Sequence, residues 1–134
     1  MESKEEILEK KQKKLKSLAM RYKSHEKLII ARQARKTLRF IEKNTEIFPN
    51  KYAVLKNKII SSCYSVLEWI YRANIFQEKD DKKEIIVQIQ MLNFYLEEAL
   101  RKELISNKKF LSYTNHLLEL DKMTRSWFSY EKAK

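Results

Sequence analysis

The chain has 134 residues but no glycine, and Pro49 is its single proline. Tight turns between β-strands need positive φ angles, which glycine adopts at the lowest cost. A chain without glycine that is rich in Lys, Glu, Leu and Ile therefore favours a few long helices joined by few connections. Its length predicts one domain that is large enough to bury a hydrophobic core.

Apolar residues spaced three and four apart divide the chain into helices. Residues 4–24 form a Lys-rich segment with few apolar positions. The first amphipathic helix covers roughly residues 25–47, and it either follows this segment or continues it, because no breaker separates the two. Pro49 ends this helix, since the residue before a proline is pushed out of helical geometry. Asn50 is a candidate cap for the second helix, which carries an apolar face that reaches Ile70.

Two further helices follow a polar break, "QEKDD". Asp81 and Glu84 have the spacing of a capping box at the start of the third helix, which is expected to reach about Leu104. Ser106 is expected to cap the fourth helix. The expected core positions of these two helices are Ile85, Ile89, Leu92, Leu96, Leu100, Phe110, Tyr113, Leu117, Leu120, Thr124 and Phe128.

The connections between the expected helices are short, which forces neighbouring helices to run antiparallel. The predicted fold class is therefore all-α, an antiparallel up-down four-helix bundle with a basic N-terminal helical extension. The bundle is expected over residues 25–134 and the extension over residues 1–24. The sequence shows no internal repeat and no low-complexity linker.

The stretch "KLIIARQARKTLRF" separates basic from apolar side chains. At 100° per residue, its basic residues and the lysine that follows fall within a sector of about 100°, and its apolar residues are centred almost opposite. One side of this helix is thus expected to be buried and the other to face an anion. The basic residues are Arg32, Arg35, Lys36, Arg39 and Lys43, and the apolar ones include Ile30, Ala34, Leu38 and Ile41.

A run of like charge is often only a solvated face, and that interpretation stays open here. Pairs such as Arg32 with Lys36 and Arg35 with Arg39, however, have the i, i+4 spacing at which like charges repel by a few tenths of a kcal/mol. A polyanion would reverse this cost, and the planar fork of arginine donates in pairs to phosphate. The net charge of +11, from 29 basic and 18 acidic residues, also favours nucleic acid as a partner.

The third helix carries a second apolar surface in addition to its core face. Val87, Met91 and Phe94 lie on its far side at the spacing i, i+4 and i+7. A helix that is apolar on two sides is normally covered on two sides, so this surface predicts an interface, with closed symmetry if the partner is another copy. Trp69, beyond the edge of the second helix's apolar stripe, is included in this predicted interface. The alternative for Trp69, and for Trp127 on the fourth helix, is a place at the periphery of the core.

No catalytic or metal site is predicted, and no cofactor is expected. Without glycine the chain has no phosphate-cradling loop and no dinucleotide fingerprint. His25 and His116 are far apart in sequence, and Cys63, on an apolar stripe, is the only softer ligand, which makes a poor zinc set.

A cytoplasmic location without membrane contact is expected. The lone cysteine allows no internal disulfide and fits a reducing compartment. The charged N-terminus does not match a secretory signal, and no apolar run approaches the length of about 20 residues that crosses a bilayer. Binding to a membrane surface is a weak alternative, because no basic helix has a broad free face of Trp, Phe and Leu.

The order of several segments resembles one known family. A basic-faced first helix is followed by "IFPNKYAVLKNKI", by "VLEWIYRAN", by "MLNFYLEEALRKELISNKKF" and, near the end, by "RSWFSY". Over about residues 27–130 this pattern is similar to the Avd family, the accessory variability determinants of diversity-generating retroelements. The wider relatives of that family are four-helix-bundle proteins encoded in ribosomal RNA intervening sequences. This chain departs from the pattern in its N-terminal extension of roughly 26 residues and in lacking the glycine that relatives often carry before the C-terminal Trp.

The resemblance implies a protein that is not an enzyme. Avd-like proteins form a homopentameric barrel with a strongly basic surface, bind RNA or DNA, and assist the reverse transcriptase of the retroelement in error-prone copying of a template RNA. The alternative function is a helical adaptor of the ribosomal RNA intervening-sequence protein type, whose charge steers it to an acidic protein partner. Matched to this chain, the resemblance implies nucleic-acid contacts at Arg32, Arg35, Lys36, Arg39, Lys56, Lys58 and Arg72.

Overall fold

The computed structural model describes the backbone of residues 3–20 and 29–132, and the side chains of residues 3–16 and 29–127. These ranges contain helices and their short connections but no strand, so the predicted all-α class is confirmed. The elements are α1 (Lys4–Met20), α3 (Ile29–Thr45), the short 3-10 helix η1 (Asn50–Tyr52), α4 (Ala53–Phe76), α5 (Lys79–Arg101) and α6 (Asn107–Lys132).

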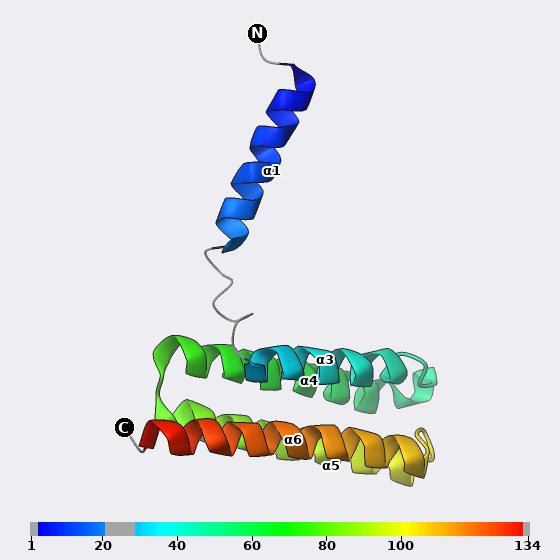
Figure 1. Ribbon diagram of the computed structural model, residues 1–134. Coiled ribbons are helices and arrows are strands. Elements are labelled where there is room, and N and C mark those ends of the chain that lie inside the picture. The colour runs from blue at the N-terminus through cyan, green and yellow to red at the C-terminus, as the bar shows by residue number, and fades with distance from the viewer. Residues whose placement is uncertain (1–2, 21–28, 133–134) are drawn as a thin grey trace.

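Helices α3, α4, α5 and α6 pack side by side around one core. Helix α3 contacts α4 and α6, and α5 likewise contacts α4 and α6. The chain reverses its direction at each connection between these four helices (Figure 1). Helix α1 stands apart from them, and all of its described side chains are exposed. The predicted boundary at residue 24, and the question whether the first two helices are continuous, fall on residues 21–28, outside the described residues.

The core uses the helix faces that the apolar spacing predicts. The predicted core residues of α5 and α6 are buried or half-buried, apart from Phe128, whose side chain is not among those described. Burying one large aliphatic side chain contributes about 1.5–3 kcal/mol, so a stripe of several holds each helix in one rotation about its axis. The predicted apolar residues of α3, Ile30, Ala34, Leu38 and Ile41, are all buried.

Two predicted helix caps are wrong and one is confirmed. Asn50 does not cap α4, because it begins η1, a single turn closed by the Tyr52 N–H on the Pro49 carbonyl at 2.9 Å. The capping box at Asp81 is also wrong, since α5 begins two residues earlier, at Lys79, and Asp81 is buried inside the first turn. The Ser106 hydroxyl does cap α6, accepting a hydrogen bond of 3.1 Å from the Lys109 N–H.

Helix α5 ends at Arg101, before the predicted Leu104, in a turn that normally uses glycine. Glu103 has a φ of 60°, the Leu104 N–H donates to the Ala99 carbonyl at 2.9 Å, and the Glu103 N–H donates to the Leu100 carbonyl at 3.0 Å. This is the Schellman pattern, which places its left-handed residue just after the helix. A residue with a Cβ atom adopts that conformation only at a steric cost, and here a glutamate bears it.

None of the helices in the described ranges is both long enough and apolar enough to cross a bilayer.

Replacing Glu103 by glycine should stabilise the protein. Glycine adopts positive φ without the clash of the Cβ atom, so Glu103→Gly should raise the free energy of unfolding by about 0.5–1 kcal/mol. Urea unfolding followed by far-UV circular dichroism measures the change. Glu68→Gly, at an exposed position inside α4, is the matched control and should lower the free energy of unfolding by about 1 kcal/mol. A destabilised Glu103→Gly protein would show that this turn is not strained.

Candidate nucleic-acid interface

The outward face of α3 carries the strongest concentration of positive charge on any of the packed helices. The helix has five basic residues and one acidic residue, Glu42, which gives a net charge of +4. Burial of the opposite face fixes the rotation of the helix, so the basic side chains are directed away from the core. We define the basic strip of α3 by Arg32, Arg35, Lys36, Arg39 and Lys43.

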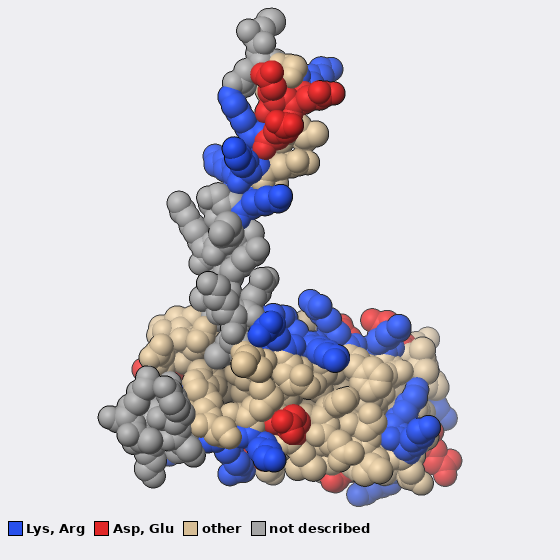
Figure 2. Space-filling model, viewed as in Figure 1, with Lys and Arg blue, Asp and Glu red and all other residues tan. Residues whose placement is uncertain are grey.

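Four of the five residues of the strip are exposed to solvent, and Arg35 is half-buried. Within the described part of the chain, none of the four exposed residues forms an ion pair. Figure 2 shows Lys and Arg side chains gathered along the edge of the molecule that α3 forms. The charge of the strip is therefore available to an anion from outside.

Two hydrogen bonds join α3 to α4 on the side of the strip that faces α4. An Arg35 guanidinium N–H donates to the Tyr71 hydroxyl at 2.8 Å, and the Tyr64 hydroxyl donates to the Glu42 carboxylate at 3.0 Å. The hydrogen bond and the charge of Glu42 raise the pKa of Tyr64. Arg35, itself a residue of the strip, thus joins α3 to α4. Sequence reasoning missed Tyr71, because a partner 36 residues away leaves no local signal.

The three other predicted phosphate contacts lie on α4. Lys58 is exposed near the start of α4, and Lys56 Nζ donates to the Glu46 carbonyl at 3.0 Å, just beyond the C-terminal end of α3. Arg72 lies near the end of α4, so the two lysines and Arg72 occupy opposite ends of one helix.

Arg72 has contacts within the protein that explain its position. Its Nε atom lies 3.6 Å from the buried Asp81 carboxylate, and its guanidinium lies 5.2 Å from the centre of the Trp69 ring and 5.7 Å from that of Phe76. These contacts join the end of α4 to the start of α5. The structure therefore gives Arg72 a role in holding the connection between these helices.

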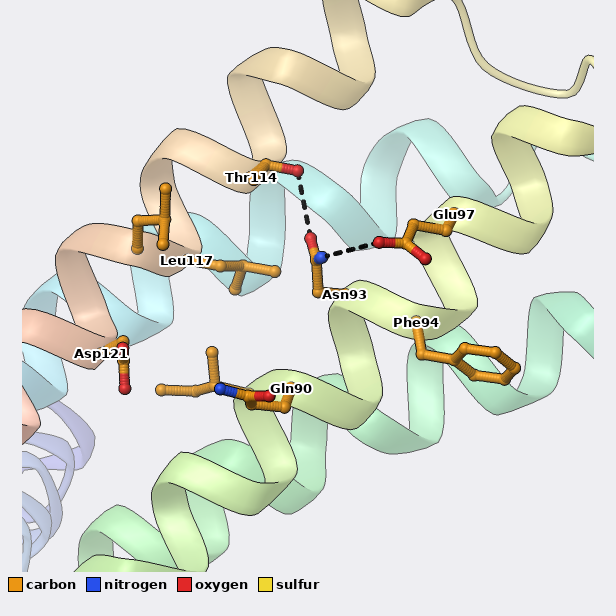
Figure 3. A pocket seen from close by; sticks show the side chains of 9 residues that line it. Gln90, Asn93, Phe94, Glu97, Thr114, Leu117 and Asp121 are labelled. Carbon is orange, nitrogen blue, oxygen red and sulfur yellow. Dashed lines mark hydrogen bonds between the residues drawn. The ribbon is translucent and has the colours of Figure 1, made fainter.

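The groove between α5 and α6 has a different chemical character (Figure 3). Asn93 lies at its centre, accepting a hydrogen bond of 3.0 Å from the Thr114 hydroxyl and donating one of 3.5 Å to the Glu97 carboxylate. Asp121 lines the same groove and accepts hydrogen bonds of 3.2 Å from Arg125. Two carboxylates, one of them paired with Arg125, give this groove a less positive character than the outward face of α3.

The second apolar surface of α5 is exposed, as its spacing predicts. Val87, Met91 and Phe94 have exposed fractions of 49%, 40% and 48%. Trp69, which the sequence predicts for the same interface, is half-buried against the core and lies close to the Arg72 guanidinium. The three α5 residues therefore supply most of the free apolar area of this predicted interface.

Trp127 and Cys63, which the sequence analysis also singled out, lie against or within the core. Trp127 is half-buried against the core, and the buried Lys82 ammonium lies 4.2 Å from the centre of its ring. Cys63 is buried, and burial together with the charge of Glu42 raises the pKa of its thiol to about 12. In the described ranges no three His, Cys, Asp or Glu side chains are grouped so that they could hold a metal ion.

Comparison with known proteins found no matching family model and no matching curated protein.

The ion pair between Arg72 and Asp81 gives a test of the contribution of this pair to stability. Arg72→Ala leaves the Asp81 carboxylate buried without its cation, so the free energy of unfolding should fall by about 1–3 kcal/mol. Arg101→Ala is the matched control: it removes an exposed ion pair with Glu98, and should cost about 0–1 kcal/mol. Thermal and urea unfolding measure both. Equal losses for the two variants would show that the Arg72 pair has no special role.

Proposed function

We propose that this chain is a non-catalytic nucleic-acid-binding protein whose basic strip on α3 binds backbone phosphates. The observation that carries the proposal is the set of four exposed cations, Arg32, Lys36, Arg39 and Lys43, on one face of a helix that is held by its buried face. Their spacing along the helix places several positive charges within reach of successive phosphates. Such contacts position a nucleic acid but do not read its sequence, so binding should depend little on sequence.

The second part of the proposal concerns assembly and partners. We infer that the four packed helices form an up-down four-helix bundle that assembles through Val87, Met91 and Phe94 into a homo-oligomeric ring, with five copies as the Avd resemblance implies. A ring would repeat the basic strip, so several weak phosphate contacts would add by multivalency. In this proposal the protein assists a retroelement reverse transcriptase in mutagenic copying of template RNA. Support for the ring is the exposed apolar surface on α5, on a helix that already has a core face.

Removal of charge from the strip tests phosphate binding directly. In the variant Arg32→Gln, Lys36→Gln and Arg39→Gln, helix propensity changes little and Arg35 keeps its bond to Tyr71. Affinity for RNA and DNA should fall roughly tenfold or more, and the dependence of affinity on salt should become less steep. Fluorescence anisotropy with labelled oligonucleotides at two salt concentrations measures both quantities.

The matched control removes the same number of charges elsewhere on the bundle. Lys83→Gln, Arg101→Gln and Lys108→Gln lie on exposed positions of α5 and α6 and should reduce affinity much less. If the two triple variants lost the same affinity for nucleic acid, the effect would come from net charge alone. That result would refute the assignment of binding to α3. Binding to an acidic protein with no measurable affinity for nucleic acid would favour the adaptor function instead.

The oligomer is tested by one substitution on the second apolar surface. Phe94→Asp places a charge in a contact that would otherwise be desolvated, so it should dissociate the assembly while the bundle stays folded. Sedimentation velocity gives the oligomeric state, and circular dichroism checks the fold. Leu111→Asp, at an exposed apolar position of α6, is the control that should leave the assembly intact. A wild-type protein that is monomeric at micromolar concentration would contradict the ring.

The retroelement role needs a separate test, because phosphate binding alone does not identify it. A reverse transcriptase gene and a near-duplicate target repeat beside the coding sequence would support it. Co-purification of that polymerase with the wild-type protein would support it further. A genomic neighbourhood without a reverse transcriptase would count against this part of the proposal and leave nucleic-acid binding unaffected.

A further inference from the structure

The face formed by α3 and α6 contains two hollows that lie along the same seam. The first has a volume of about 510 Å³ and is lined by apolar side chains that include Ile29, Met123 and Trp127. The second has a volume of about 360 Å³ and is lined by Phe40 and His116 among others. In Figure 2 this face is largely free of charge between the edges where Lys and Arg gather. An apolar seam of this kind on a bundle is normally covered.

Helix α1 has an apolar stripe that is exposed. Ile7, Leu8 and Leu15 are exposed large apolar side chains, and they fall within a sector of about 100° around the helix. Lys4 and Lys11 lie in the same sector, where their aliphatic stems can cover apolar surface while the ammonium groups reach water. The helix is therefore amphipathic and lacks a covered side within the described residues.

The spacing of the stripe matches the spacing of the hollows. On α6, His116 lines the second hollow and Met123 the first, and the two are seven residues apart. Leu8 and Leu15 on α1 are also seven residues apart. Seven residues correspond to a rise of about 10 Å along a helix. With Leu8 at the second hollow and Leu15 at the first, α1 runs parallel to α6 and antiparallel to α3. Lys11 then lies level with Glu119, the acidic residue of the first hollow, which Lys122 also lines.

The sequence separation between α1 and α3 is compatible with this arrangement. Residues 21–28 join the end of α1 to the start of α3. Connections of two to eight residues are usual between antiparallel neighbours in helical bundles. The first hollow includes Ile29, the first residue of α3, so the docking face begins where this connection ends.

We propose that α1 folds back onto its own chain and docks along the α3–α6 seam as a further helix of the bundle, with Leu15 and Leu8 in the two hollows. The proposal is independent of nucleic-acid binding. In this position α1 covers Phe40 and Trp127 and meets the basic strip at Lys36, which lines the second hollow. Glu5 and Glu9 come level with Arg39 and Lys36 in this register and lie outside the apolar stripe of α1.

Disulfide trapping in the full chain tests the docked position and its register. Leu15→Cys together with Met123→Cys should form a disulfide under mild oxidation. The native Cys63 is buried, and the raised pKa of its thiol keeps it out of the reaction. Leu15→Cys with Leu118→Cys is the matched control, because Leu118 lines the α5–α6 groove and not the α3–α6 seam. Oxidation of a mixture of isotope-labelled and unlabelled chains, followed by mass spectrometry, distinguishes bonds within a chain from bonds between chains.

A specific bond within one chain for the Met123 pair, with little bond formation in the Leu118 pair, is the expected result. Equal yields for the two pairs would show that α1 has no preferred face and would overturn the proposal. Predominantly mixed-isotope species would overturn it in favour of docking on a second copy.

Tryptophan fluorescence gives a second measurement that does not depend on added cysteines. In a Trp69→Phe background, Trp127 is the only tryptophan and lines the first hollow. Leu8→Glu with Leu15→Glu should expel α1 and shift the emission of Trp127 to longer wavelength. Lys13→Ala with Lys16→Ala changes the net charge by the same amount on the other side of α1 and should leave the emission unchanged. An unchanged spectrum in the Leu8 and Leu15 variant would refute docking.

Discussion

Burial of one face of α3 is the constraint on which the candidate site depends. Ile30, Ala34, Leu38 and Ile41 lie inside the core, and their burial fixes the rotation of the helix about its axis. Because a helix places residues at 100° intervals, that rotation also directs the basic strip outward. The positive surface is therefore a consequence of core packing, and its residues need few contacts of their own to stay in place.

Charge is divided between two sides of the molecule. Four residues of the strip on α3 are exposed and free of ion pairs in the described part of the chain, whereas Glu97 and Asp121 line the groove between α5 and α6. The two surfaces therefore differ in electrostatic character, with cations on one and carboxylates in the other. The apolar surface of Val87, Met91 and Phe94 lies on α5, so assembly through it would leave α3 accessible in each copy.

The chain makes its turns without glycine, and the structure shows how. Gln77 and Glu103 adopt positive φ after α4 and α5, and Pro49 leads into a single 3-10 turn between α3 and α4. Arg72 and Asp81 then join the two helices on either side of Gln77. Turns that carry a steric cost depend on such contacts between helices, because packing of the bundle must hold the strained residues in place.

The sequence by itself determined the all-α class, the core faces of the helices and the exposed position of most of the basic strip, because these follow from a helical period that acts within each segment. The cap at Ser106 was predictable for the same reason, since its partner Lys109 is three residues away. Only the tertiary structure decided the contacts between distant segments. Arg35 with Tyr71 and Arg72 with Asp81 join different helices, and no local pattern marks which polar residues will meet when helices pack. Asp81 shows the difference most clearly: its spacing to Glu84 suggests a cap, but the packing of α4 against α5 buries it within a helix as the partner of an arginine.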